Sequence, residues 1–229
     1  AVGGGSVIDS CKAIGYGVAN PWTDVWNFFL KTETPKACLP VAAIPTIAAS
    51  GSEMSNSCVI TNEDGWLKRG SVKSDLCRPR FALLNPRLTY SLPQYQTESG
   101  CVDILMHTME RYFVNIETME ITDSISESLM QTVIYNARIL MKEPGNYNAR
   151  AEVMWAGSLS HNGLTGCGTG GGDWACHQLQ HELGGLYDVA HGAGLAAVWG
   201  SWARYVYQEN PERFAQFATN VFDIPCYSD

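Results

Sequence analysis

Hydrophobic and polar residues follow two different patterns along the chain, and the change comes near Pro93. Before it, short apolar runs alternate with glycine and proline, which is typical of strands and helices joined by turns. These runs predict a helix over residues 7–16 and strands over 39–45, 57–61 and 80–85. The first part of the chain therefore has an α/β pattern.

After Pro93 the apolar positions recur at helical spacing. Pro93 suits the first turn of a helix that carries Asp103 and His107. Ser124 and Glu127 have the spacing of a capping box, in which two side chains satisfy backbone amides at a helix start. Further helices are predicted over 149–162, over 174–187 with Asp173 as N-cap, and from 191 to about 207. We therefore expect an α/β part over 1–91 and an all-helical part over 92–229.

The composition is that of an ordinary globular protein with an acidic balance. Hydrophobic residues make up 45% of the 229 residues, charged residues make up 17%, and the formal net charge is -8. An acidic chain without clusters of lysine and arginine repels a phosphate backbone, so we expect no nucleic-acid partner. The apolar runs are too short for a membrane segment. The 8 cysteines form no Cys-x-x-Cys pair, and we expect reduced thiols in the cytoplasm.

Two loops rich in small residues could hold the phosphates and sugar of a nucleotide. Gly3-Gly4-Gly5-Ser6 lies between a predicted strand end and a helix, where backbone amides without a nearby Cβ form an anion site. Residues 46–53 follow the predicted strand 39–45 and offer small hydroxyl side chains. On these residues alone each loop can equally be an ordinary turn, because the spaced glycines of a dinucleotide fingerprint are absent.

The five histidines are distributed in a way that indicates a metal site. His177 and His181 are four residues apart and share one face of a predicted helix, as do Asp103 and His107 on another. Two such pairs on facing helices can converge on one divalent cation. The zinc-protease motif that would start at His181 requires a histidine at position 185, where the chain has Gly185. We therefore predict a metal site that is not of the zinc-protease type.

A series of motifs occurs in order over essentially the whole chain. They are Gly3-Gly4-Gly5-Ser6 with Asp9 and Lys12, Pro45-Thr46 through Gly51-Ser52-Glu53, Asn85-Pro86, Asp103-x-x-x-His107-x-x-Glu110, and His177-x3-His181-x9-His191-Gly192. Together they resemble the iron-containing alcohol dehydrogenases, and most closely the butanol dehydrogenase branch of that family. Glycerol dehydrogenases and dehydroquinate synthases share the architecture but lack the ligand that His107 supplies here.

The resemblance implies a fold and a set of site residues. The implied fold is a partial Rossmann-like nucleotide-binding domain over 1–91 and an all-helical metal-binding domain over 92–229, a dehydroquinate synthase-like architecture. The implied ligands of Fe²⁺, or alternatively Zn²⁺, are Asp103, His107, His177 and His191. The residues implied for NAD or NADP are Gly4, Gly5, Ser6, Thr46, Ile47, Ser52, Lys68 and Leu88. His181 would relay a proton or, alternatively, only pack beside the ligands. We assign His161 to structure, and Trp155, Trp174 and Trp199 to the core and not to a substrate pocket.

The implied activity is that of an NAD(P)-dependent alcohol dehydrogenase or aldehyde reductase. Hydride would pass between a small primary alcohol, such as butanol, and the nicotinamide while a metal ion polarises the oxygen. The family also suggests a homodimer. Ser50 and Asn85 depart from the family's usual threonine and aspartate, and Lys68 could instead be a solvated surface lysine.

Several strands that precede the glycine turn in the family are expected to be missing from this chain, and so are some C-terminal helices. The residues that choose between NAD and NADP lie in that missing part, so this choice stays open. Two alternatives to the enzyme also stay open: a truncated metal-binding fragment without catalytic activity, and a metallohydrolase.

Overall fold

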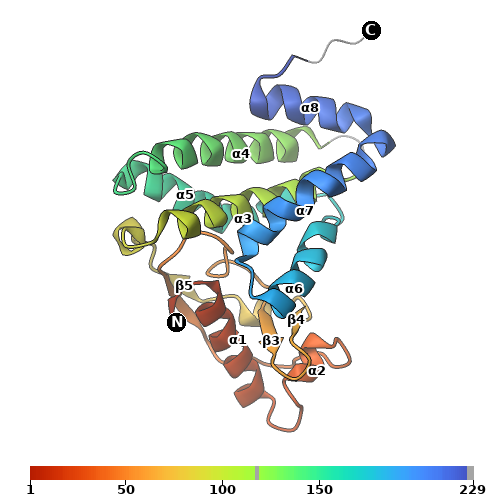
Figure 1. Ribbon diagram of the computed structural model, residues 1–229. Coiled ribbons are helices and arrows are strands. Elements are labelled where there is room, and N and C mark those ends of the chain that lie inside the picture. The colour runs from red at the N-terminus through yellow and green to blue at the C-terminus, as the bar shows by residue number, and fades with distance from the viewer. Residues whose placement is uncertain (117–118, 226–229) are drawn as a thin grey trace.

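The structure of the protein is a computed structural model that describes residues 1–116 and 119–225. Figure 1 shows an α/β part at the bottom and, above it, a part built from helices that cross one another. The predicted order of an α/β part followed by helices is therefore confirmed. None of the helices in the described ranges combines the length and the apolar character that crossing a membrane requires.

A small parallel sheet forms the centre of the α/β part. Its strands run in the order β1 (Val2–Gly3), β2 (Ala42–Pro45) and β5 (Phe81–Ala82). Val2 pairs with Ile44, and Ala42 pairs with Phe81. Parallel neighbours require a crossover connection, and α1 (Gly5–Ala19) supplies the helix of the first one.

The packing of α1 holds the glycine turn in place. Tyr16 is fully buried, and its ring meets Phe28 of α2 (Trp26–Phe29) edge-on at a centroid distance of 5.8 Å. Both belong to one apolar cluster that α1 shares with α2 and with the buried Cys58 and Cys77. Because α1 follows β1 directly, this packing keeps the N-terminus of α1 at the carboxyl end of the strand, where parallel sheets bind ligands.

An antiparallel hairpin of the α/β part packs against the helical part. β3 (Val59–Asn62) pairs with β4 (Leu67–Gly70). We predicted a strand over 57–61 but not β4, because Lys68 and Arg69 interrupt its apolar pattern. β4 packs against α6, so the hairpin places Lys68 beside the helical part.

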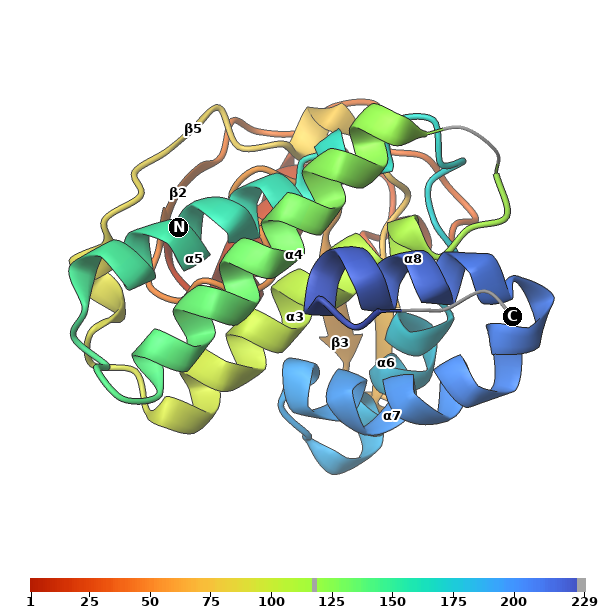
Figure 2. The ribbon, with the colours of Figure 1, turned by 90° about the horizontal axis from the view of Figure 1, so that it is seen from above.

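Most of the helical part consists of long helices. In the described residues they are α3 (Gln94–Tyr112), α4 (Glu120–Leu140), α5 (Tyr147–His161), α6 (Ala175–Tyr187), α7 (His191–Val206) and α8 (Pro211–Phe222). Short 3₁₀ helices are η1 (Asp75–Cys77), η2 (Pro86–Thr89), η3 (Leu164–Gly166) and η4 (Tyr207–Glu209). α3 packs against α4, α5 and α7, and Figure 2 shows α4 and α5 side by side. α3 is therefore the central helix, with an apolar cluster on each side.

Two helix starts differ from the sequence prediction. α4 begins at Glu120, so Ser124 and Glu127 lie inside the helix and form no capping box. Glu127 instead accepts a hydrogen bond from Tyr112 Oη at 2.7 Å. Asp173 is not the N-cap of α6, because that position is held by Trp174 with a left-handed backbone (φ 67°) and no capping side chain. In both places tertiary packing outweighs a local capping signal.

Candidate metal centre and nucleotide cleft

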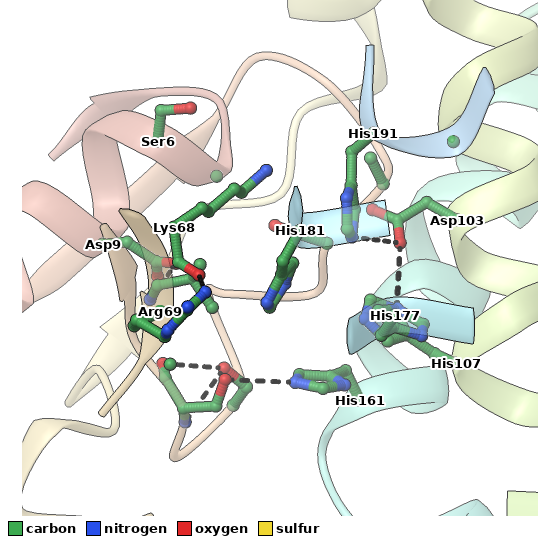
Figure 3. A pocket seen from close by; sticks show the side chains of 18 of the residues that line it. Ser6, Asp9, Lys68, Arg69, Asp103, His107, His161, His177, His181 and His191 are labelled. Carbon is green, nitrogen blue, oxygen red and sulfur yellow. Dashed lines mark hydrogen bonds and ion pairs between the residues drawn. The ribbon is translucent and has the colours of Figure 1, made fainter. Parts of the chain in front are cut away.

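A large cavity lies between the α/β part and helices α3, α6 and α7. Its volume is about 1020 Å³, at the upper end of the range for cofactor sites. The residues predicted from the sequence that line it are Gly4, Gly5, Ser6, Ile47, Lys68, Asp103, His107, His177, His181 and His191. Figure 3 shows Asp103 with His177 and His191 on one side and Ser6 and Lys68 on the other. Two groups of motifs that are far apart in the sequence thus share one cavity.

Asp103 lies at the centre of the cluster of predicted metal ligands. Its Oδ1 atom is 3.7 Å from His107 Nδ1, 3.7 Å from His177 Nε2 and 3.6 Å from His191 Nε2. Asp103 and His107 share a face of α3, while His177 comes from α6 and His191 is the first residue of α7. The structure therefore brings the predicted ligands together from three helices.

The donor atoms of this cluster fit a divalent cation. Asp103, His107 and His177 each offer one ligand atom, and these atoms lie within 4.8 Å of one another. Asp103 Oδ1, His107 Nδ1 and His177 Nε2 are buried and have no hydrogen-bond partner among the described residues. Buried polar atoms without partners are rare, and a cation would satisfy all three. His191 joins this group through its contact with Asp103. A set of one carboxylate and several imidazoles suits Fe²⁺ or Zn²⁺.

Burial and neighbouring charges set the protonation states of the cluster. Burial lowers the pKa of His107 well below its ordinary value and lowers the pKa of His191 to about 4. Burial alone would raise the pKa of Asp103, but His191 and His177 outweigh it and lower this pKa. Burial alone would lower the pKa of His177, but Asp103 and Glu110 raise it. A cation would therefore meet the ionised carboxylate of Asp103 and the neutral rings of His107 and His191, whereas at His177 it would compete with a proton.

His181 and Lys68 line the cavity beside the cluster. His181 lies one helical turn after His177, and its ring stacks on His191 at a centroid distance of 5.7 Å. Burial, followed by the nearby His191, lowers the pKa of His181 to about 3, so this ring is neutral at neutral pH. Burial also lowers the pKa of Lys68, which is half-buried in the cavity wall. Lys68 therefore lies in the cavity wall, and its role as a nucleotide contact stays a prediction.

The glycine turn forms the opposite wall, at the N-terminus of α1. The amides of Val7 and Ile8 both donate to Gly4 O at 3.1 Å, so the helical ladder starts there and the preceding amides lie outside it. A Cβ atom on Gly5 would lie only 2.5 Å from Ser50 Oγ, so a larger residue would displace the second loop. Free amides at a helix start next to open space suit a phosphate group.

Thr46, Ser52 and Leu88 are not among the lining residues of this cavity. The Ser52 hydroxyl is buried, donates a hydrogen bond to Asp9 and accepts one from Lys12 Nζ at 2.8 Å. Leu88 lies in η2 and is 41% exposed. Their roles as nucleotide contacts stay predictions, and for Ser52 the structure shows a different use of the hydroxyl.

His161, which we assigned to structure, and Trp174, which we assigned to the core, both line the cavity, and Trp174 is only half-buried. The centroid of the His161 ring lies 4.0 Å from that of His107, and its Nδ1 lies 3.2 Å from an Arg111 nitrogen. The Trp174 ring lies 5.1 Å from the His177 ring. Little in the sequence indicated that either residue lines the cavity. For Trp174, only the preceding glycines 170–172 could have indicated its left-handed backbone. His161 has no helical spacing to the other histidines.

Comparison with known protein families identifies the fold and the motifs. Residues 1–86 match the family described as iron-containing alcohol dehydrogenase, and residues 97–229 match the C-terminal region of the Fe-containing alcohol dehydrogenase family. The chain belongs to the iron-containing alcohol dehydrogenase family. The resemblance predicted from the motifs is thus confirmed, and with it the Rossmann-like part followed by a helical part.

Individual members of the iron-containing alcohol dehydrogenase family agree closely with the chain. The probable NADH-dependent butanol dehydrogenase 1 of Bacillus subtilis is 40% identical over 224 residues, which are 98% of this chain and 57% of the relative. The NADPH-dependent aldehyde reductase of Escherichia coli is 35% identical over 232 residues, which are 100% of this chain and 59% of the relative. The crystal structure of NADH-dependent butanol dehydrogenase A from Thermotoga maritima matches with a TM-score of 0.95 and 38% identity, and the match covers 100% of this chain and 56% of that chain.

Proposed function

We propose that this protein is a metal-dependent, NAD(P)-linked alcohol dehydrogenase or aldehyde reductase that acts on small primary alcohols such as butanol. One observation carries the proposal: a single cavity holds the Asp103 cluster on one wall and the glycine turn on the other. The activities named for the relatives, an NADH-dependent butanol dehydrogenase and an NADPH-dependent aldehyde reductase, support it.

Asp103, His107, His177 and His191 would hold the metal ion, for which we propose Fe²⁺, with Zn²⁺ as the alternative. When bound, such an ion supplies Lewis-acid chemistry that polarises the C–O bond of an alcohol or aldehyde. The chain provides the negative charge of Asp103, which is 2% exposed, together with the neutral rings of His107 and His191. These residues keep water away from the donor atoms on the buried side of the cluster.

Gly4, Gly5 and Ser6 would bind the diphosphate of NAD or NADP through the free amides at the start of α1. The remaining residues proposed to lie near the ribose and the nicotinamide are Thr46, Ile47, Ser52, Lys68 and Leu88. Ile47 and Lys68 have the strongest support, because both line the cavity that the glycine turn faces.

His181 would move the proton that leaves or joins the substrate oxygen. Its ring is neutral at neutral pH because burial lowers its pKa to about 3. A neutral ring has one nitrogen that donates and one that accepts a hydrogen bond, so it can take a proton from the substrate oxygen on one side while it releases one on the other. The ring lies in the cavity close to His191. A positioned acid–base group of this kind typically contributes about 10²–10⁴-fold to the rate.

The proposed activity can be tested by loading the protein with Fe²⁺ or Zn²⁺ and following the absorbance of the nicotinamide. We expect turnover of butanol with oxidised cofactor, or of butanal with reduced cofactor, and loss of turnover after treatment with a chelator. Asp103→Asn should abolish turnover, whereas Asp64→Asn in the exposed hairpin turn should leave it unchanged. Absence of turnover with both metals and both cofactors would refute the proposal.

A metal-binding chain without catalytic activity is the alternative, and one observation favours it. The chain spans about 57% of the length of the curated butanol dehydrogenase that it matches. Titration with NADH, followed by cofactor fluorescence, separates the two, because only the proposed enzyme binds the nucleotide. We also propose a cytoplasmic location and a homodimer, and light scattering in solution tests the oligomeric state.

A further inference from the structure

We propose that Gln180 and Glu110 are positioning residues that aim the rings of His191 and His177 at the metal site. The assignment rests on the proposed metal centre, but it concerns two residues that are not ligands themselves. The motif Asp103-x-x-x-His107-x-x-Glu110 left Glu110 without a role, and no motif of the sequence analysis includes Gln180.

The contact between Gln180 and His191 determines which ring nitrogen of His191 is free. Gln180 Oε1 accepts a hydrogen bond from His191 Nδ1. A neutral imidazole carries one hydrogen, so a hydrogen on Nδ1 leaves the lone pair on Nε2. This Nε2 atom lies 3.6 Å from Asp103 Oδ1, on the side where the cluster converges. The amide oxygen of Gln180 therefore selects the tautomer and the orientation that a metal ligand needs.

Two glycines leave a narrow slot that confines the Gln180 side chain. A Cβ atom on Gly194 of α7 would lie 2.8 Å from Gln180 Cγ and 3.0 Å from Gln180 Nε2. A Cβ atom on Gly184, one turn further along α6, would lie 3.0 Å from the same Nε2 atom. Any larger residue at either position would push the amide away from its place. The slot thus holds the amide between the two helices that carry His177 and His191.

A packing role alone does not explain a glutamine at this position. Gln180 is fully buried, and its Nε2 atom has no hydrogen-bond partner among the described residues. A buried amide hydrogen without a partner destabilises a folded protein, so an apolar side chain would fill the slot at lower free energy. The glutamine is therefore explained by what its oxygen does for His191.

Glu110 makes the corresponding contacts with His177. Glu110 is buried on the face of α3 that carries Asp103 and His107. Its Oε1 atom accepts the backbone N–H of His177 at 2.9 Å and lies 3.1 Å from His177 Nδ1. The ring N–H is not well aligned with this oxygen, since Nδ1 makes no full hydrogen bond. His177 Nε2 is nevertheless left facing Asp103 at 3.7 Å.

Metal affinity measured on variants of Gln180 tests the proposal. Zn²⁺ and anaerobic Fe²⁺ are titrated in competition with a chromophoric chelator, and circular dichroism checks the fold. Gln180→Met keeps the length of the side chain but removes the acceptor, and we expect the affinity to fall about 10–100-fold. Gln180→Glu keeps an acceptor oxygen and should restore most of the affinity. A role in packing alone predicts the reverse order, because Met fills the slot better than a charged side chain.

A second pair of variants keeps the test decisive if Gln180→Met does not fold. Gly194→Ala leaves the glutamine in the sequence but displaces its side chain, so metal affinity should fall. Gly200→Ala in the same helix is the matched control, because its Cβ would meet only the end of Arg204 at 3.8 Å. Equal metal affinity for Gly194→Ala, Gln180→Met and the unchanged protein would overturn the positioning role. Absence of metal binding by the unchanged protein would instead overturn the proposed metal centre, and this assignment with it.

Discussion

Replacement of Lys12 by methionine should destabilise the protein strongly, although Lys12 lies outside the metal cluster. Lys12 is fully buried in α1, and its ammonium group has no access to solvent. Its Nζ atom donates to Ser52 Oγ and to Ser57 O at 2.8 Å each, and to two oxygens of Ser55 at 3.2 Å. The Asp9 carboxylate lies 3.7 Å away, with only 11% of its side chain exposed.

The magnitude follows from what the substitution leaves behind. Removal of one partner from a buried ion pair costs about 3–5 kcal/mol. The Asp9 carboxylate would keep its hydrogen bonds from Ser52 and from the Val59 amide but would lose its buried counter-ion. The two shortest hydrogen bonds, each about 1.5–3 kcal/mol for a charged donor, give a similar sum and describe the same loss. We therefore expect Lys12→Met to lower the free energy of unfolding by about 4 kcal/mol. At about 2–4 °C per kcal/mol for a chain of this size, Tm should fall by about 8–16 °C.

Urea unfolding followed by tryptophan fluorescence measures this loss. Lys142→Met serves as the control, because Lys142 is exposed and an exposed substitution should change the free energy by less than about 0.5 kcal/mol. The double variant Asp9→Asn with Lys12→Met should be less destabilised than the sum of the two single variants, since the buried charge is then absent. A loss below about 1 kcal/mol for Lys12→Met would show that the buried network is not as described.

Three further predictions concern the cavity itself. Asp103→Asn removes the carboxylate from the four predicted ligands. Metal analysis of the purified variant should show less than one tenth of the metal bound by the unchanged protein. Full occupancy would contradict the ligand assignment. His181→Gln should leave the bound metal unchanged and lower kcat by about 10²–10⁴-fold, and an unchanged kcat would remove His181 from proton transfer. Gly5→Ala forces a Cβ to 2.5 Å from Ser50 Oγ and should weaken NADH binding about tenfold in a fluorescence titration. Gly145→Ala, where a Cβ meets nothing within 4 Å, is its control.

Most of the long helices and the residues of the metal cluster could be predicted from the sequence, because local spacing indicated the helices and the family motifs indicated the ligands. Pro93 indicated the start of α3, and the bounds predicted for α5 and α7 agree with the structure to within a few residues. The four-residue spacing of Asp103 and His107 placed both on one face of their helix, since a helix repeats every 3.6 residues. The family motifs then indicated which other histidines belong with them.

Only the tertiary structure decided which atoms meet, because that depends on how helices from distant parts of the chain cross. The approach of α6 to α7 places the oxygen of Gln180 against His191, and no spacing in the sequence predicts this contact. The crossing of α3 with α5 likewise brings His161 to within 4.0 Å of His107. β4 was not predicted because Lys68 and Arg69 line the cavity and interrupt the apolar alternation that indicates a strand. Local periodicity determines the helices, whereas long-range packing determines the site.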